Sequence, residues 1–520
     1  MYHSKKIGVF ISHIFGTYQQ GVCQGIIDKA LEYGYTTEIF TSLDGENLGA
    51  YEIGEESILR IPNYESFDGI IFASDTYIST DLKHKILDRL KTLSCPIVEI
   101  AVTDSHFPSV SLENSSMAGD LTAHFLTVHH ASRVCYLGCS AEPSFSDLRE
   151  NHYRKTLENY GKTPGEYDIC HCGYDPCAVK EALAFFCQAG TPEAVVCYND
   201  RLALLFTAAA LAAGYHIPRD IALTGCDDTP EGHSISLMLT TVSFPVYDLG
   251  AAAVGNLLTL IHGDRLPAVT FLPAKPLFGN SCGCTLSENA SSVFFLQEQT
   301  ARIAALENSI LGSMSMSSSL QHVTDLDGGM DLLEQFVRKI EHCKEFYLCL
   351  YSDWDSVSSH ILALTNNEEA PADRNTVLLK FALKNGKRMP ECSYRKKNLL
   401  PDYIYDSSDC AYIYIPLFFE EREFGYLALA YEDNRIDFHF RPVQWQSNIN
   451  QMLQDICEAK STAMLVDRLE NIYMKDALTC LNPFFKALSG SFRHSVLSTL
   501  FPPTLLLSVD NLIIVFLTFG

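Results

Sequence analysis

Two cysteine-containing segments carry the side chains best suited to metal or redox chemistry. Residues 170–177 contain three cysteines and one histidine, which are ligand types that zinc prefers. A Cys-x-Cys pair without a second paired knuckle is not a standard zinc spacing, so we interpret this segment as a β-strand. Residues 282–284 read Cys-Gly-Cys, which we interpret as two reduced thiols at the end of a domain. We therefore predict no bound metal and no cofactor.

The sequence contains no set of residues that is typical of a catalytic site. It has no Ser–His–Asp arrangement, no P-loop and no glycine fingerprint for a dinucleotide. His129 and His130 lie between a predicted helix and a predicted strand, where a structural turn is the simplest interpretation. We therefore predict no catalytic residues and a protein that is not an enzyme.

Composition and charge limit the classes of partner that the chain is expected to bind. The 520 residues are 47% hydrophobic and 19% charged, which is typical of several globular domains. A formal charge of −25 opposes binding to nucleic acids, because that affinity comes largely from Lys and Arg. The amino terminus has too short an apolar stretch for an export signal, so the 18 cysteines should stay reduced. We expect a cytoplasmic protein with no nucleic-acid partner.

The end of the chain differs from the rest. Residues 504–519 are almost entirely apolar. A membrane-spanning helix needs about 20 such residues, and Asp510 lies in the middle of this segment, where a charge is costly. We therefore expect no membrane span.

Apolar strands and amphipathic helices alternate along residues 6–284. The helical stretches include residues 21–33 and 202–213. This alternation predicts an α/β fold with parallel sheets and helices on both faces. The predicted strands span residues 7–12, 36–40, 69–73, 97–100, 134–138, 194–198 and 221–225.

The pattern changes after residue 284. Residues 285–329 predict a linker helix and a dimer contact, because apolar residues recur at a spacing similar to that of a coiled coil. These residues are Leu296, Ile303, Leu306 and Ile310.

A smaller α+β domain is predicted for residues 330–445. Residues 346–351, 412–419 and 424–431 are strand-like, and a charged turn between the last two predicts a hairpin. Residues 446–475 predict a signalling helix that ends near Met474.

Five motifs occur in order along residues 1–284. They are Phe67-Asp68-Gly69-Ile70-Ile71, Val110-Ser111-Leu112-Glu113-Asn114, Tyr198-Asn199-Asp200-Arg201-Leu202-Ala203, residues 212–228 and Leu239-Thr240-Thr241-Val242. Together they resemble a LacI-type sensor domain, which has the fold of periplasmic binding proteins. The resemblance implies two doubly wound lobes, joined by three crossovers, that close on a small ligand such as a sugar or a purine.

The same resemblance implies which residues bind the ligand. Tyr18 and Gln19 follow the first strand, Arg149 matches the arginine between the lobes, and Asp200 and Asp227 follow later strands. Arginine donors and carboxylate acceptors suit a ligand that carries several hydroxyl groups. Alternatives remain: Asp200 also fits a helix N-cap, and Arg149 could pair with a nearby glutamate.

The second half carries two weaker resemblances. Tyr414-Ile415-Pro416-Leu417 and Phe424-Gly425-Tyr426-Leu427 resemble a GAF-like domain. Asp476-Ala477-Leu478-Thr479 resembles the start of a GGDEF diguanylate cyclase, but the family pattern stops after residue 480. Residues 487–520 contain one acidic residue, too few to hold Mg²⁺ against the phosphates of GTP. We expect a truncated cyclase in residues 476–520.

The leading hypothesis is a ligand-sensing signalling protein, a homodimer that binds a sugar-like or nucleoside-like metabolite and has lost its output enzyme. One alternative is an active diguanylate cyclase. The other is a LacI-family transcription regulator that lacks its DNA-binding headpiece, since the first sensor strand begins near Lys6.

Overall fold

The computed structural model describes residues 5–43, 54–102, 105–113, 116–233, 237–285, 292–321, 323–356, 375–405, 410–435 and 442–488. Two compact units are distinguished: Met1–Asp355 with Ala372–Asp455, and Ser356–Pro371 with Ile456–Gly520. The helix α13 (Pro442–Leu488) begins in the first unit and continues into the second. The other elements below lie in the first unit. The predicted cyclase remnant falls on the end of α13 and on residues outside the described part of the chain.

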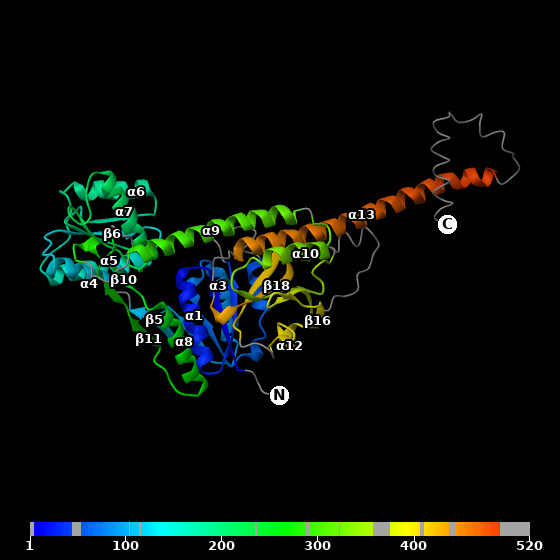
Figure 1. The fold of residues 1–520 in the computed structure, drawn as a ribbon, viewed down its shortest axis with the longest axis horizontal. Helices are drawn as coiled ribbons and strands as arrows, with labels where there is room; N and C mark the ends of the chain where they lie inside the picture. The colour runs from blue at the N-terminus through cyan, green and yellow to red at the C-terminus, as the bar shows by residue number, and fades with distance from the viewer. Residues whose placement is uncertain are drawn as a thin grey trace, which may run out of the picture. The chain divides into compact units, whose positions relative to one another are not determined.

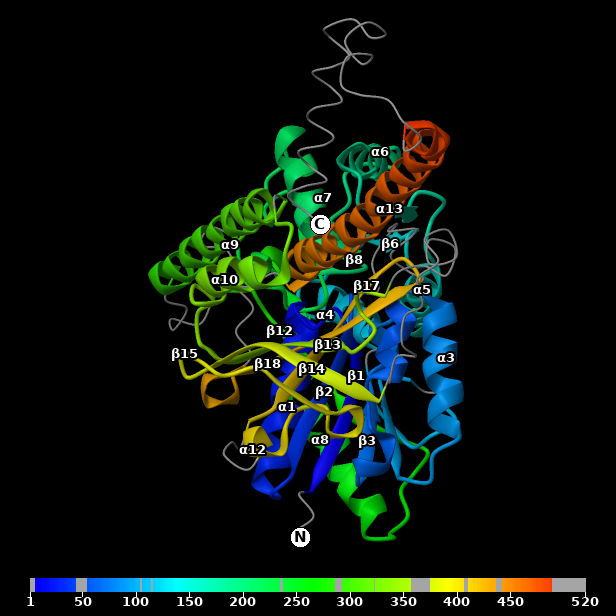
Figure 2. The same cartoon turned by 90° about the vertical axis from the view of Figure 1, so that its right-hand side faces the viewer.

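Lobe 1 is built on six parallel strands in the order β11-β5-β4-β3-β1-β2. Strands β1, β2, β3 and β4 are nearly all buried, as expected for strands with helices on both faces, whereas the edge strand β11 is partly exposed. Figure 2 shows the strands between α1 and α3. The elements are β1 (Lys6–Ser12), α1 (Thr17–Glu32), β2 (Thr36–Ser42), β3 (Gly69–Phe72), α3 (Thr80–Lys91), β4 (Ile97–Ile100), β5 (Ser109–Glu113), α8 (Val246–Ile261) and β11 (Val269–Pro273).

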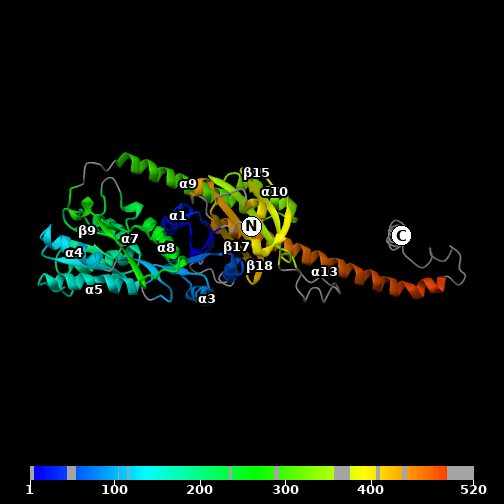
Figure 3. The same cartoon turned by 90° about the horizontal axis from the view of Figure 1, so that it is seen from below.

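Lobe 2 has four parallel strands in the order β7-β6-β8-β9. Apolar residues of α6 and α7 pack on one face of this sheet, and those of α4 and α5 pack on the other. Figures 1 and 3 show these helices gathered around β6 and β9. The elements are α4 (Met117–Thr127), β6 (Val134–Cys139), α5 (Pro143–Asn159), β7 (Ile169–Cys172), α6 (Pro176–Cys187), β8 (Ala194–Cys197), α7 (Asp200–Ala212) and β9 (Ala222–Thr224).

The chain passes between the lobes three times, as the resemblance implied. It leaves lobe 1 after β5, returns after β10 (Thr241–Ser243) to form α8, and leaves again after β11. Strand β12 (Lys275–Leu277) pairs with β10 in antiparallel orientation, so two of the crossovers are hydrogen-bonded to each other. This pairing ties the connecting segments together at the point where the two lobes meet.

A group of antiparallel strands forms the core of the smaller domain. Its strands follow the order β17-β18-β13-β14-β15, with β16 also paired to β14. The elements are α9 (Ser292–Leu320), α10 (Leu326–Val337), β13 (Cys343–Tyr351), β14 (Thr376–Lys384), β15 (Lys387–Arg388), β16 (Cys392–Arg395), α12 (Asp402–Tyr405), β17 (Tyr412–Phe419), β18 (Arg422–Tyr431) and α13.

The sheets of lobe 1 and the smaller domain form one continuous sheet. Tyr412, Ile413 and Tyr414 of β17 pair in parallel with residues 38–40 of β2. The ring of Tyr414 stacks on that of Phe40, with centroids 5.1 Å apart. Pairing in this way covers the edge of β2, which would otherwise expose unpaired backbone groups.

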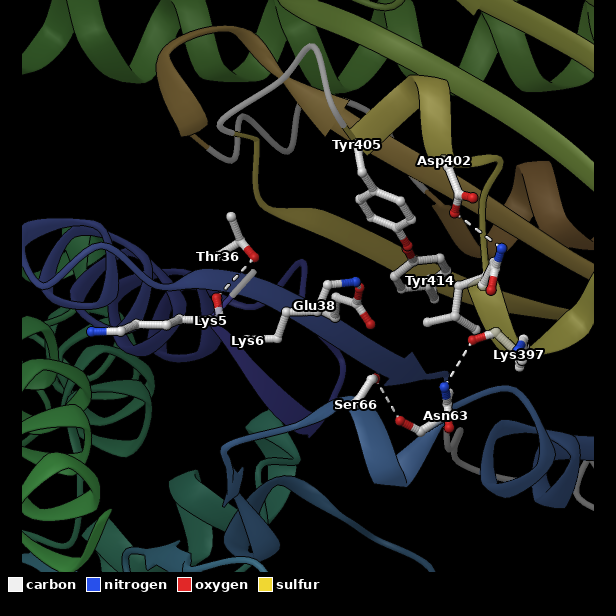
Figure 4. Close-up of polar contacts among 12 residues, drawn as sticks. Lys5, Lys6, Thr36, Glu38, Asn63, Ser66, Lys397, Asp402, Tyr405 and Tyr414 are labelled. Atoms are coloured by element: carbon white, nitrogen blue, oxygen red, sulfur yellow. Dashed lines mark hydrogen bonds and ion pairs between the residues drawn. The ribbon is translucent and has the colours of Figure 1, made fainter. Parts of the chain in front are cut away.

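Polar contacts reinforce this junction, as Figure 4 shows. The Lys6 ammonium lies 2.6 Å from Oε1 of the buried Glu38 and 4.0 Å from the ring centroid of Tyr405. The Tyr405 and Tyr414 hydroxyls are 2.8 Å apart, and the Asn63 amide donates to the Lys397 carbonyl at 2.9 Å. The junction is therefore an extension of the core rather than a surface contact.

Most predicted elements are confirmed, and one boundary is wrong. The seven sensor strands and the β17–β18 hairpin occur where the sequence predicted them, and α9 occupies the predicted linker. The prediction that the last helix ends near Met474 is wrong, because α13 continues to Leu488. Residues 475–482 contain no glycine and no proline, so no strong local signal stops the helix near Met474. Within the described residues, no helix is long and apolar enough to span a bilayer.

Candidate functional site

Arg149 lies at the centre of a polar cluster in lobe 2. It projects from α5 and is only 8% exposed. Its Nη1 donates a hydrogen bond to the Tyr198 carbonyl, and its guanidinium carbon lies 4.6 Å from the centroid of the Tyr198 ring. Its Nη2 lies 3.6 Å from Oδ1 of Asp227. Two predicted site residues, Arg149 and Asp227, are therefore in contact.

The strands of the lobe 2 sheet explain why these side chains meet. Glu142 follows β6, Tyr174 follows β7, Tyr198 follows β8 and Asp227 follows β9. The carboxyl ends of parallel strands lie along one edge of a sheet, and ligands of such folds bind beyond that edge. The cluster thus occupies the place where this fold binds ligands.

Four members of the cluster were not predicted as site residues. The Tyr198 hydroxyl donates to Oε2 of Glu142 at 2.8 Å, and the Tyr174 hydroxyl donates to Oε1 of the same carboxylate at 2.6 Å. The Asn199 amide donates to the Tyr174 hydroxyl at 3.0 Å. Tyr198 ends a predicted strand and Asn199 follows it, so the position of these two residues was visible in the sequence. Glu142 and Tyr174 are identified only by the fold.

Asp200 lies in the interior of lobe 2, beneath the polar cluster around Arg149. Asp200 is fully buried. Its Oδ1 accepts a hydrogen bond from the Thr241 hydroxyl at 2.6 Å, and its Oδ2 accepts one from the Thr229 N–H at 2.8 Å. Burial raises its pKa to about 7, although these two hydrogen bonds oppose the shift. The helix N-cap is Asn199, whose side chain accepts from the Leu202 N–H at 3.0 Å. Asp200 therefore fastens the loop after β9 to strand β10.

Asp227 belongs to that loop and reaches solvent. Its side chain is 37% exposed, and its φ of 109° lies in the left-handed region that non-glycine residues rarely adopt. Its N–H donates to the Val242 carbonyl at 3.2 Å, which ties the strained residue to β10. The surrounding protein atoms raise its pKa to about 6, with Arg149 acting in the opposite direction. Such strain is typical of functional positions.

Tyr18 and Gln19 lie on lobe 1, where α1 begins after β1. The Tyr18 hydroxyl donates to Oδ2 of Asp75, which follows β3, at 2.7 Å. Gln19 folds back over Gly16, and a Cβ on that glycine would lie 2.1 Å from the Gln19 Oε1. These side chains therefore stand at the carboxyl edge of the lobe 1 sheet, as Arg149 and Asp227 do in lobe 2.

The Cys170–Cys177 segment is a strand end, as the sequence predicted. It contains β7, and Cys172 is buried in the lobe 2 core. His171 points toward α5, where its Nε2 lies 2.6 Å from Oε2 of Glu150. The three cysteines and His171 therefore do not converge on one point.

Comparison with known proteins identifies the sensor. Residues 122–282 match the family described as "Periplasmic binding protein-like domain". The chain is 25% identical over 285 residues to catabolite control protein A of Priestia megaterium, a match that covers 54% of this chain and 82% of the relative. The chain contains a LacI-type, periplasmic-binding-protein-like domain.

Other relatives match the same LacI-type domain. The HTH-type transcriptional regulator RegA of Clostridium saccharobutylicum is 25% identical over 272 residues, covering 51% of this chain and 77% of the relative. Among solved structures, the transcription regulator CcpA of Lactococcus lactis aligns at 22% identity with a TM-score of 0.43, covering 54% of this chain and 99% of that chain. A putative LacI-family regulator from Rhizobium etli aligns at 23% identity with a TM-score of 0.43 and the same coverage.

Proposed function

We propose that the LacI-type domain senses a small polar metabolite, sugar-like or nucleoside-like, which binds between the carboxyl edges of its two lobes. The observation that carries this proposal is the loose ion pair between Arg149 and Asp227. At 3.6 Å, the pair is longer than a hydrogen bond, so both groups keep donors and acceptors for a ligand. A purely structural ion pair of a buried arginine is expected to be shorter.

Each residue of the proposed site has a distinct role. Arg149 and Asp227 bind hydroxyl or carbonyl groups of the ligand, while Tyr18 and Gln19 contact it from lobe 1. Asp200 acts as a positioning residue, because it holds the loop that carries Asp227. Glu142, with the Tyr174 and Tyr198 hydroxyls, adds a second polar patch beside Arg149.

A binding screen with site variants tests this proposal. The full chain is screened against sugars and nucleosides by thermal shift, and affinities for any hit are then measured by calorimetry. Arg149→Lys keeps the charge but loses the forked donors of the guanidinium group. It should weaken binding by about 10–100-fold, which corresponds to the loss of one hydrogen bond to a charged group. Asp227→Asn should have a similar effect.

The control is Arg154→Gln, on the same helix, because Arg154 pairs with Glu150 away from the cluster. Its affinity should equal that of the unmodified chain. Equal affinity for the Arg149 and Asp227 variants as well would show that the ligand binds elsewhere.

We propose that binding is relayed to the smaller, GAF-like domain through the continuous sheet. Lobe closure moves lobe 1, and β2 of lobe 1 is hydrogen-bonded to β17. The signal then passes to α13, where residues 476–479 resemble the start of a diguanylate cyclase, and we propose that this segment has no cyclase activity. Incubation of the full chain with GTP tests the last point, since formation of cyclic di-GMP would show an active enzyme.

A second candidate function is transcription regulation, because the relatives bear the names of transcriptional regulators. The net charge of −25 disfavours direct binding to DNA. A gel-shift assay of the full chain with genomic fragments at physiological salt distinguishes the two: a specific shifted band would favour the regulator.

A further inference from the structure

A cluster of two histidines and two cysteines lies in lobe 2. His124 is in the last turn of α4 and His129 follows that helix, whereas Cys282 and Cys284 come from the end of the sensor domain. The two Nε2 atoms are 3.1 Å apart. The Sγ of Cys284 is 3.5 Å from Nε2 of His124 and 3.4 Å from Nε2 of His129.

The cluster is distinct from the ligand site. Helix α4 precedes β6 and packs against it, so its carboxyl end lies at the amino end of the parallel strands. Arg149 and Asp227 lie at the opposite edge of the same sheet. The four cluster residues are therefore not explained by ligand binding.

The spacing of the four side chains is that of a tetrahedral metal site. One ligand atom from each residue lies within 4.8 Å of all the others. In a zinc site with two nitrogen and two sulfur ligands, bond lengths of about 2.1 and 2.3 Å place neighbouring ligand atoms roughly 3.3–3.8 Å apart. The separations of 3.1, 3.5 and 3.4 Å between the two Nε2 atoms and the Sγ of Cys284 agree with this range to within a few tenths of an ångström.

The surroundings hold these side chains in place. The His124 ring stacks on Phe278, with centroids 4.3 Å apart and planes at 29°. Cys282 is 1% exposed. Gly283 has a φ of +100°, and a Cβ there would lie 3.3 Å from Cε1 of His129. A glycine between the two cysteines thus allows the turn that brings both thiols to the histidine pair.

We propose that His124, His129, Cys282 and Cys284 bind one zinc ion. Two thiolates and two imidazoles are a standard structural zinc set, and carboxylates, which would favour harder cations, are not among the four ligands. On binding, each cysteine releases its thiol proton to solvent, and each histidine binds as the neutral imidazole.

The ion would fasten the exit of the sensor domain to lobe 2. His124 and Cys284 are 160 positions apart in the sequence, and the described chain continues through residue 285 before α9 begins at Ser292. Cross-linking segments so far apart restricts the unfolded chain strongly. The site would therefore hold the beginning of the connection to α9 against α4.

Metal analysis of the full chain tests this inference. The protein is prepared without a histidine tag and under reducing conditions, and its metals are quantified by mass spectrometry. We expect about one zinc ion per chain, consistent with a single four-ligand site. Replacement with Co²⁺ should give the intense visible absorption of tetrahedral cobalt and a sulfur-to-cobalt charge-transfer band.

Variants assign the ligands. Cys284→Ser and His129→Gln should each weaken zinc affinity by more than about 10-fold, since even outer-shell partners contribute that much. The controls are Cys177→Ser and His84→Gln, which change an exposed cysteine on α6 and an exposed histidine on α3. Both should keep the full zinc content.

Three results would overturn the inference. The first is that the unmodified chain contains far less than one zinc ion and gives no spectrum of tetrahedral cobalt. This measurement does not depend on how the variants fold. Another is full zinc content in both ligand variants. The third is a disulfide between Cys282 and Cys284 in protein kept under reducing conditions.

Discussion

Asp200 and Asp227 follow neighbouring strands in the same sheet, yet their surroundings give them different roles. Asp227 has a partly exposed carboxylate beside Arg149, and Asp200 is fully buried between the Thr229 N–H and the Thr241 hydroxyl. A buried carboxylate loses more hydration than two neutral donors restore, which explains why its pKa rises to about 7. Position after a strand thus does not by itself assign a ligand contact.

The raised pKa of Asp200 predicts a pH-dependent stability. Between about pH 4 and pH 7 the folded chain holds a proton on Asp200 that the unfolded chain has lost, so stability falls as pH rises through this window. The contribution is at most about 1.4 kcal/mol per pH unit. Asp200→Asn, which does not titrate, should remove the Asp200 contribution and make the slope shallower, and urea unfolding at several pH values in the window measures it.

The control for that measurement is Asp220→Asn. Arg219 holds the pKa of Asp220 below its ordinary value, so above about pH 5 this carboxylate is ionised in both the folded and the unfolded chain. Its replacement should leave the slope unchanged. Parallel stability curves for the unmodified chain and the Asp200 variant would show that Asp200 does not titrate in this range.

At the scale of elements, the closest packing in lobe 1 joins α1 and α8. A Cβ on Gly25 would lie 2.0 Å from the Tyr247 carbonyl oxygen, and one on Gly250 would lie 2.0 Å from the Val22 carbonyl oxygen. Each helix therefore uses a glycine to bring its backbone against the other. Helix α8 also follows the second crossover directly, so the position in which it packs on α1 determines how the lobes are connected.

Two glycines of α8 provide a matched test of this packing. Gly250→Ala should lower the free energy of unfolding by about 3 kcal/mol, because backbone atoms cannot yield to the added methyl group. A Cβ on Gly255 would meet no atom within 4 Å. Gly255→Ala should therefore raise the free energy of unfolding by about 1 kcal/mol, because alanine has a higher helix propensity than glycine. Denaturant unfolding measures both, and equal effects would contradict the proposed backbone contact.

At the scale of the whole molecule, the sensor and the smaller domain share apolar packing. Phe10, Phe40 and Phe72 of lobe 1 belong to the same buried cluster as Tyr347, Tyr414 and Tyr426. Shared burial of this kind makes the unfolding of one part expose the core of the other. The two domains should therefore unfold together.

Tyr414→Ala tests that cooperativity. It removes the ring that stacks on Phe40 and should lower stability by about 3–5 kcal/mol. Calorimetry should then resolve two transitions where the unmodified chain shows one. Tyr403→Ala, at a residue 45% exposed, is the control and should shift stability by less than about 1 kcal/mol. A single transition in the Tyr414 variant would show that other contacts couple the domains.

If the chain forms the homodimer predicted from its sequence, exposed apolar residues of α9 should form the contact between the two copies. Ile303 and Ile310, seven residues apart, are 57% and 38% exposed, as expected for residues that another chain covers. Ile310→Glu should weaken dimerisation by about 10-fold or more, whereas Ala304→Glu on the same helix should not, since it lies off the stripe. Sedimentation equilibrium measures both, and a monomeric unmodified chain would refute the dimer.

The sequence predicted the local elements well because their signals are local. Alternating strands and helices fixed the α/β class and seven sensor strands, and the charged turn located the β17–β18 hairpin. The resemblance placed Arg149 between the lobes and Asp227 after a strand, and in the structure their side chains lie 3.6 Å apart. The end of α13 was placed near Met474, although the helix continues to Leu488 through Pro483, a residue type that usually breaks helices.

Contacts between distant segments were decided by the tertiary structure alone. The sequence gives the residues of β2 and β17 but no signal that strands about 370 positions apart should pair, since pairing depends on which edges the fold leaves open. The same holds for Cys284 and His124, which the sequence showed as unrelated residues. Periodicity and spacing act over a few residues, whereas a shared sheet edge or a four-ligand cluster exists only after the chain has folded.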